Sequence, residues 1–243
     1  MPKIILITGA STGIGAETAR CLSEGNELFL HYNASKGAAE RVADDVEARG
    51  GRPLLLQADL TSEAGCSALV KAVAEKTSKL DVLVNNAGGL VRRKPVRELD
   101  WTLMLEVFSL NVFSMMKMTA LCVPLLERGV DPCIVNISSV AARVGAPTAT
   151  IYGAAKGAVD TFTRGAAREL APRIRVNAVA PGVIETPFHD KVTSPERMKQ
   201  FKEETPLKRL GQAAHIAHAV RFIIENDFLD GETIDVNGGL FMR

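Results

Sequence analysis

Short hydrophobic segments alternate with longer amphipathic segments along most of the chain. The short segments are rich in Val, Ile and Leu and show no alternation of apolar and polar residues, which predicts strands buried on both faces. We expect these strands at 3–8, 27–32, 54–58, 81–84, 133–137, 174–179 and 232–236. The longer segments carry apolar residues at helical spacing. We expect these helices at 13–24, 36–49, 63–77, 101–127, 152–170 and 213–225.

Buried strands separated by helices predict a parallel sheet that is covered on both faces. We therefore expect an α/β fold, a doubly wound Rossmann-type domain of about seven parallel strands flanked by helices on both faces. The length of 243 residues allows one large domain or two small ones. Because the chain shows no internal repeat and no linker-like change of composition, we expect a single domain over residues 1–243. Ligands of such folds bind at the carboxyl ends of the strands.

Composition and charge narrow the functional classes. Lys and Arg number 29 against 28 Asp and Glu, and this balance argues against nucleic-acid binding. The longest unbroken apolar runs, 4–7 and 120–123, are far shorter than the ~20 residues of a membrane span. With no room for a signal peptide before residue 8, we expect a cytoplasmic protein that is not bound to a membrane. The cysteines lack ligand spacing, so we expect reduced thiols and no metal site.

A glycine-rich turn follows the first predicted strand and opens the first predicted helix. It reads Thr8-Gly-Ala-Ser-Thr-Gly-Ile-Gly15, a GxxxGxG spacing. Glycines at this place let backbone N–H groups approach a pyrophosphate at the start of the helix, so the turn predicts dinucleotide binding. The alternative interpretation is an ordinary tight turn, which glycine also favours.

The end of the second predicted strand bears on the choice of cofactor. NAD-binding folds commonly have an Asp or Glu there, which binds the ribose 2′-hydroxyl. Residues 31–36 contain no carboxylate, and Asn33, Ser35 and Lys36 could accept a 2′-phosphate instead. This favours NADP(H) over NAD(H). The alternative is a polar loop and helix cap that merely lacks the acid.

Tyr152 and Lys156 lie four residues apart on a predicted helix and therefore share one face. A free tyrosine has a pKa near 10, and a neighbouring ammonium group is expected to lower it, which would make Tyr152 an acid/base group. Ser138 and Ser139 follow the fifth predicted strand. A hydroxyl at that sheet edge could hold a reacting oxygen, although either serine could also only cap a turn.

The motifs resemble, in order and over essentially the whole chain, those of the short-chain dehydrogenase/reductase family. The matching segments are the TGxxxGxG turn, the NNAG motif at 85–88, the serine and YxxxK set at Ser139, Tyr152 and Lys156, and the Pro181-Gly182 segment with Thr186. The resemblance implies an NAD(P)(H)-dependent oxidoreductase that interconverts a ketone and a secondary alcohol by hydride transfer. It also selects Ser139 over Ser138.

The same resemblance assigns roles to individual positions. The catalytic set would be Asn111, Ser139, Tyr152 and Lys156, with Asn111 holding a water in a proton relay and Lys156 also binding the nicotinamide ribose. Together with the candidates above, the cofactor-binding set is Gly9, Ser11, Thr12, Gly13, Ile14, Gly15, Asn33, Ser35, Lys36, Asp59, Leu60, Asn86, Ala87, Gly88, Tyr152, Lys156, Pro181, Gly182 and Thr186.

The substrate is the least determined part of this hypothesis. A 3-oxoacyl thioester is our first expectation and a sugar, polyol or other alcohol the second; a cofactor-binding regulatory protein without turnover is the alternative of another class. Residues 185–210 resemble the family's substrate lid. Four cations lie between Arg92 and Arg97, and they are either a solvated loop or a site for an anionic substrate or carrier.

The resemblance also implies partners. Arg128 and Arg173 lie where oxoacyl-carrier-protein reductases of the family meet their acidic carrier, so an acyl carrier protein is a possible partner besides the small-molecule substrate. Many members of the family are tetramers built on two long helices and the last strand. These correspond here to 101–127, 152–170 and 232–236, and we expect a homotetramer or homodimer.

Overall fold

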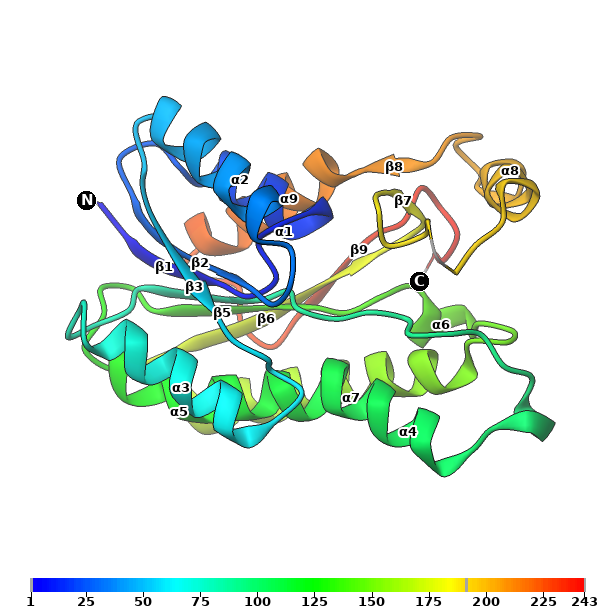
Figure 1. The fold of residues 1–243 in the computed structure, drawn as a ribbon, viewed down its shortest axis with the longest axis horizontal. Coiled ribbons are helices and arrows are strands. Elements are labelled where there is room, and N and C mark those ends of the chain that lie inside the picture. The colour runs from blue at the N-terminus through cyan, green and yellow to red at the C-terminus, as the bar shows by residue number, and fades with distance from the viewer. Residues whose placement is uncertain (1, 191, 243) are drawn as a thin grey trace.

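A seven-stranded parallel sheet forms the centre of the computed structural model, which describes residues 2–190 and 192–242 (Figure 1). The strand order is β3-β2-β1-β4-β5-β6-β9, and each neighbouring pair is parallel. The order reverses between β1 and β4, so a crevice opens there at the carboxyl ends of the strands. The predicted fold class is confirmed. The strands are β1 (Ile4–Ile7), β2 (Glu27–Tyr32), β3 (Arg52–Gln57), β4 (Val82–Asn85), β5 (Cys133–Ile137), β6 (Arg175–Pro181) and β9 (Thr233–Val236).

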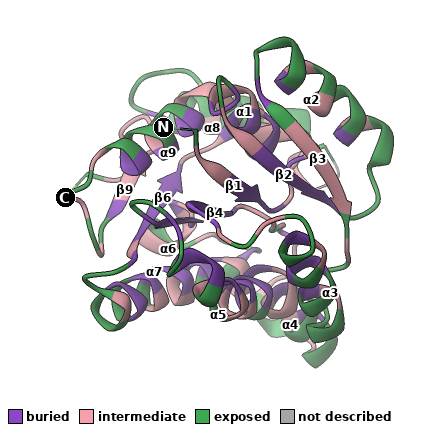
Figure 2. Ribbon diagram, turned by 90° about the vertical axis from the view of Figure 1, so that its left-hand side faces the viewer, coloured by how far each residue is buried: buried purple, intermediate pink, exposed green. Residues whose placement is uncertain are grey.

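Helices cover both faces of the sheet (Figure 1). One layer contains α1 (Gly13–Cys21), α2 (Lys36–Ala48) and α9 (Ala213–Glu225), and the other contains α3 (Glu63–Ala74), α5 (Ser114–Leu126) and α7 (Thr150–Leu170). Successive strand residues point to opposite layers: Ile5 and Ile7 pack into the first core, and Leu6 packs into the second. Figure 2 shows the sheet between two half-exposed helical layers, with the central strands largely buried and the edge strands β3 and β9 mostly of intermediate exposure.

The predicted helix over 101–127 is one helical stretch in the structure, with an irregular turn in the middle. α4 (Trp101–Phe108) continues through a π turn, η2 (Ser109–Phe113), into α5. By length and composition this stretch could cross a membrane, although its longest unbroken apolar run is short. Half of its most apolar part is buried inside the protein, where Met118, Cys122 and Leu126 pack with α3. A core helix passes the same test.

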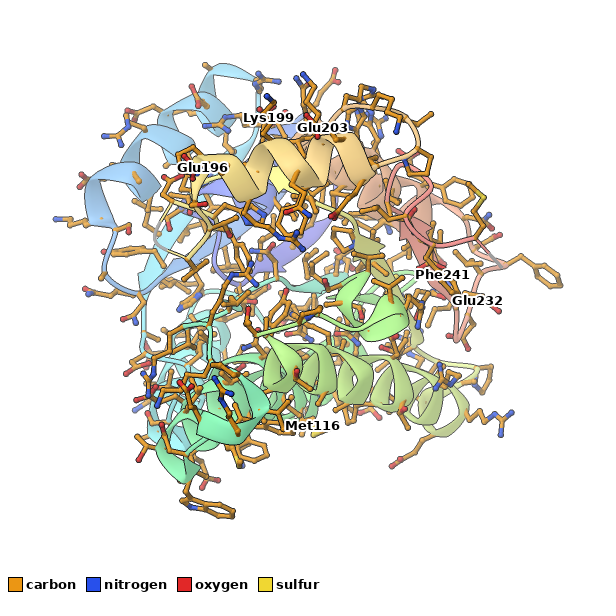
Figure 3. The ribbon with its side chains drawn as sticks, turned by 90° about the vertical axis from the view of Figure 1, so that its right-hand side faces the viewer. Met116, Glu196, Lys199, Glu203, Glu232 and Phe241 are labelled. Carbon is orange, nitrogen blue, oxygen red and sulfur yellow. The ribbon has the colours of Figure 1, made fainter. Side chains whose placement is uncertain are left out.

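Further elements gather at the carboxyl edge of the sheet. α6 (Ala141–Val144), η1 (Val96–Glu98), α8 (Pro195–Glu204) and the small parallel pair β7 (Ile184–Glu185) and β8 (Gly211–Gln212) lie outside the predicted elements. Ser194 caps α8 by accepting a hydrogen bond from the Arg197 amide at 3.3 Å, and Pro195 follows it. Ser-Pro at a helix start is a sequence signal that could have revealed α8. Figure 3 shows α8 at this edge, with Glu196, Lys199 and Glu203 on its exposed side.

Candidate active site

The glycine turn after β1 leaves the first turn of α1 open to a ligand. Gly9 and Gly13 have φ values of 64° and 56°, which L side chains rarely adopt. The N-cap residue Thr12 makes no side-chain hydrogen bond to the first turn of α1. The amide groups at this helix start are therefore available to an anion such as a pyrophosphate.

The NNAG motif holds this turn in place from the neighbouring strand. Asn86 Nδ2 donates to the carbonyl oxygens of Thr8 and Gly9 at 3.0 and 2.9 Å. The amides of Asn86 and Ala87 both donate to Thr8 Oγ1 at 3.0 Å. The two motifs, far apart in sequence, thus form one hydrogen-bonded unit at the switch point between β1 and β4.

His31 is a residue at this turn that the sequence analysis did not single out. Its Nδ1 accepts a hydrogen bond from the Gly9 amide at 3.0 Å, and its Nε2 lies 3.1 Å from the Ala58 carbonyl oxygen. Burial lowers the pKa of His31, which keeps the ring neutral with the proton on Nε2. Its place at the end of β2, facing the glycine turn, is the signal that could have revealed it.

The proposed catalytic residues of α7 and β5 converge at the same edge. The Lys156 Nζ donates to the Ile137 carbonyl oxygen at 2.8 Å and lies 5.7 Å from the centroid of the Tyr152 ring. The Ser139 hydroxyl is close enough to Tyr152 to lower the pKa of its phenol, and Ser139 Oγ accepts a hydrogen bond from the Ala141 amide at 3.1 Å. Ser138 instead donates to the Lys156 carbonyl oxygen at 3.3 Å and is buried. The two serines thus have different environments, and only Ser139 influences the tyrosine hydroxyl.

The pKa of Tyr152 moves in the direction opposite to the sequence-based expectation. Burial raises the pKa of this phenol to about 12, and the nearby Ser139 hydroxyl opposes the rise. Burial also lowers the pKa of Lys156 to about 8, while the Asp160 carboxylate opposes that change. Desolvation therefore outweighs the Lys156–Tyr152 attraction in the protein by itself.

Asn111 lies in the π turn, behind the cavity surface. Its Nδ2 donates to the carbonyl oxygens of Gly89 and Val107, both at 2.8 Å, and its Oδ1 accepts from the Gly89 amide at 3.0 Å. The bond to Val107 places a side-chain donor inside the helical ladder, where π turns commonly mark functional sites. A Cβ on Gly88 would lie 2.8 Å from Asn111 Oδ1 and 3.3 Å from Lys156 Nζ. Only glycine fits between these two groups.

A buried ion-pair network supports α7 on the side facing β9. Arg143 Nη1 pairs with Asp160, and Arg143 Nε lies 3.2 Å from Asp235 Oδ1. Asp160 lies one turn after Lys156 and is buried. Through Asp160, the Arg143 guanidinium is linked electrostatically to the ammonium group beside the proposed acid/base.

One cavity of about 880 Å³ joins the glycine turn to the proposed catalytic residues. It is lined by every predicted site residue except Gly15, Lys36 and Asn111. Gly15 packs against the Gly9 carbonyl, and Lys36 is exposed with its Nζ 3.6 Å from Glu40 Oε1. The part of the cavity beyond Tyr152 is lined by residues that the candidate set did not include, among them Leu90, Arg93, Phe188, His189, Arg197 and Phe201.

Comparisons with known proteins cover almost the whole chain. A family model described as enoyl-(acyl carrier protein) reductase matches residues 9–241. The 3-oxoacyl-[acyl-carrier-protein] reductase FabG of Staphylococcus aureus is 38% identical over 250 residues, covering 100% of this chain and 99% of the relative. The uncharacterized oxidoreductase YgfF of Escherichia coli is 36% identical over 244 residues, covering 97% of this chain and 99% of the relative.

Solved structures give the same result. A structure described as the RhlG/NADP active-site complex of Pseudomonas aeruginosa matches with a TM-score of 0.91 at 29% identity, covering 98% of this chain and 96% of that chain. A protein of Burkholderia xenovorans assigned to the short-chain dehydrogenases/reductases matches with a TM-score of 0.89 at 31% identity, covering 98% of each chain. Sequence and fold together show that the chain belongs to the short-chain dehydrogenase/reductase family of oxidoreductases.

Proposed function

We propose that the protein is an NADP(H)-preferring oxidoreductase that interconverts a ketone and a secondary alcohol, with Tyr152 as the acid/base. The observation that carries this proposal is a single cavity whose wall holds both the glycine turn and the Ser139–Tyr152–Lys156 group. The name of the relative FabG favours a 3-oxoacyl thioester as the substrate. A sugar, polyol or other alcohol is the second candidate.

The residues present fit a dinucleotide. The uncapped start of α1 would take the pyrophosphate, and Asp59 and Leu60 line the cavity where an adenine would lie. Gly182 and Thr186 also line the cavity, and Thr186 lies next to Gly13 of the glycine turn. When bound, the nicotinamide supplies or accepts the hydride. Lys156, whose ammonium group lies beside Tyr152, would also bind the nicotinamide ribose.

The chain's own residues would handle the proton and the reacting oxygen. The Ser139 hydroxyl would hold the substrate oxygen, and the Tyr152 hydroxyl would donate its proton to that oxygen during reduction and take it back during oxidation. A phenol with a raised pKa is fully protonated at neutral pH, which suits the reductive direction. Asn111 would hold a water of the proton relay behind Lys156.

Carbonyl reduction is favoured over the reduction of a carbon–carbon double bond that the description of the family model suggests. Ser139 and Tyr152 both line the cavity wall, with the Ser139 hydroxyl near that of Tyr152. Such a pair can bind and protonate one oxygen atom, as the reduction of a carbonyl group requires. A 3-oxoacyl and a 2-enoyl thioester of equal chain length, assayed side by side for NADPH oxidation, distinguish the two reactions.

The preference for NADP(H) rests on the end of β2. Asn33 and Ser35 line the cavity there, and no carboxylate occupies residues 31–36. A 2′-phosphate would meet polar, uncharged groups and no repelling acid. Titration with NADPH and NADH tests this preference directly, and tighter binding of NADH would contradict it.

Tyr152→Phe tests the acid/base assignment. The variant loses the hydroxyl but keeps the ring, so turnover should fall by about 10²–10⁴-fold while the Kd for NADPH stays within about twofold. Undiminished turnover on a confirmed substrate would contradict the mechanism. If the wild type binds NADPH but turns over no member of a broad carbonyl and alcohol panel, the regulatory alternative gains support.

We further propose a single cytoplasmic domain over residues 1–243 that works as a homotetramer or homodimer. Residues 185–210 would form the substrate lid, and α8 gives this segment an ordered centre. An acyl carrier protein remains a candidate partner. The guanidinium groups of Arg128 and Arg173 donate to backbone carbonyl oxygens at 2.5 Å (Ser78) and 2.8 Å (Gly129), which would hold both positive charges in place at the surface.

A further inference from the structure

Three of the four cations in the loop between Arg92 and Arg97 are paired with carboxylates. Arg92 Nη1 lies 2.7 Å from Glu106, Lys94 Nζ lies 2.5 Å from Asp100, and Arg97 Nε lies 3.5 Å from Glu98. These pairs explain most of the basic loop as ordinary surface electrostatics. Arg93 differs from its neighbours.

Arg93 is half-buried and bonds only neutral groups of the lid. Its Nε donates to the Val192 carbonyl oxygen at 2.7 Å, and its Nη2 donates to Thr193 Oγ1 at 3.3 Å. Within residues 2–190 and 192–242 no carboxylate lies at ion-pair distance from Arg93, and its Nη1 has no hydrogen-bond partner. A partly buried guanidinium without a counter-charge is unfavourable unless something else supplies the charge.

The surroundings of Arg93 make its charge less favourable still. Burial and the nearby positive charge of Arg197 lower the pKa of Arg93. Burial and the charge of Arg93 in turn lower the pKa of His189. Asp190 lines the same cavity without pairing with Arg93, and Arg197 lies 3.4 Å from Glu204.

Arg93, His189 and Arg197 all line the cavity that holds Tyr152. Phe188, next to His189, packs on Tyr152 with the ring centroids 5.9 Å apart. The unbalanced charge is therefore in the substrate part of the proposed active site, and a bound substrate would lie against it.

We propose that Arg93, assisted by Arg197, binds an anionic oxyacid group of the substrate, a carboxylate or a phosphate. A planar guanidinium with unused N–H groups suits such a group because it can make two parallel hydrogen bonds to it. The proposal rests on the proposed function and narrows it: the ketone or alcohol at Tyr152 is an acid, or is carried on a phosphate-bearing arm.

Arg93 could instead serve only to hold the lid through Val192 and Thr193. The two roles differ in their effect on substrates that share a carbonyl but differ in charge. Loss of a lid contact weakens turnover of charged and neutral substrates alike, whereas loss of an anion site weakens only the charged ones.

The experiment compares Arg93→Gln with the wild type on matched substrate pairs. One pair is acetoacetate and its ethyl ester; the other is a 3-oxoacyl thioester of coenzyme A and of N-acetylcysteamine, which lacks phosphate. We expect kcat/KM for one anionic member to fall by about tenfold or more, mainly through KM, while its neutral counterpart changes by less than about twofold. The pair that responds identifies the carboxylate or the phosphate as the ligand.

Arg97→Gln is the matched control, because Arg97 is paired with Glu98 and lines neither the cavity nor the smaller pocket that Arg93 shares with Val192 and Thr193. Arg93→Lys keeps the charge and should recover part of the lost kcat/KM. Equal losses on both members of each pair would overturn the anion site and favour the role as a lid contact, and no loss on any member would overturn both roles.

A binding measurement separates failure of this inference from failure of the proposed function. Malonate and inorganic phosphate are titrated into the wild type and Arg93→Gln by calorimetry, which needs no turnover. Binding of at least one anion to the wild type, weakened about tenfold in the variant, supports the site even if no carbonyl is reduced. The anion site is overturned if both anions bind equally to the two proteins or to neither, and if Arg93→Gln affects charged and neutral substrates equally.

Discussion

Lys156 illustrates how a single residue is governed by opposing electrostatic influences. Its ammonium group is buried, and burial lowers its pKa to about 8, while Asp160 opposes the change. An unfolded lysine keeps its proton to a pKa near 10.4, so between about pH 8 and pH 10 the unfolded chain binds more protons than the folded one. This group therefore makes the folded protein relatively more stable as pH rises through that window. In the proposed mechanism, activity requires the protonated form of Lys156 and would fall over the same pH range.

Asp160→Asn should narrow the pH range of activity. The negative charge of Asp160 opposes the effect of burial on Lys156, so its removal should lower the pKa of Lys156 further. The alkaline limb of the kcat/KM profile should then move to lower pH by about one unit. Asparagine can still accept a hydrogen bond from Arg143, which preserves the fold. The pH profile of ketone reduction measures the shift, with the exposed Asp44→Asn as the control. An unchanged alkaline limb would refute the link between Asp160 and the catalytic proton.

At the scale of elements, a buried polar chain connects two strands to the helix that carries Tyr152. Asn85 on β4 donates to Asn136 on β5 at 2.9 Å, and Asn136 donates to Thr163 on α7 at 2.9 Å. All three side chains are buried, so each bond lies in a low-dielectric interior where an unpaired group is costly. This chain gives α7 a defined position on the sheet.

Asn136→Ala should destabilise the protein because it removes one hydrogen bond each from the buried side chains of Asn85 and Thr163, which keep only their bonds to Thr119 and to the Val159 carbonyl oxygen. We expect the free energy of unfolding to fall by about 2–4 kcal/mol, measured by urea denaturation. A double-mutant cycle with Thr163→Val isolates the Asn136–Thr163 bond, since the second change should cost little once the first is made. Additive losses in the cycle would show that the two side chains are not coupled.

The elements that the sequence predicts well are those whose pattern is strong. The seven strands and the helices of both layers lie within a few residues of their predicted positions, because buried strands and amphipathic helices carry clear periodicities. α8 was not predicted because only Arg197, Met198 and Phe201 are partly buried on an otherwise exposed, charged helix. Motif spacing similarly located Tyr152 and the glycine turn, whereas His31 and Arg93 acquire their roles only through tertiary contacts.

At the scale of the whole molecule, two apolar surfaces remain exposed outside the cavity. On α4 and η2, Trp101 and Phe113 are 73% and 52% exposed. Next to α9 and β9, Phe228 and Met242 are 99% and 72% exposed. Large exposed apolar groups mark interaction surfaces, and a closed tetramer would form if each of two separate faces packed against its own copy. The first surface lies on the stretch 101–127 that the family resemblance assigns to subunit contacts, whereas Phe228 and Met242 lie before and after the last strand, β9.

Trp101→Glu combined with Phe113→Glu should disrupt the surface formed by α4 and η2. Burying two carboxylates in an apolar contact is unfavourable, so a tetrameric wild type should become a dimer, and a dimeric one a monomer. Light scattering after size exclusion measures the change. Val130→Glu, 40% exposed before β5, is the control and should leave the assembly intact. Because both substituted side chains lie outside the cavity lining, the dissociated variant should still bind NADPH. A wild-type monomer, or an assembly unaffected by the double substitution, would contradict the assignment of this surface.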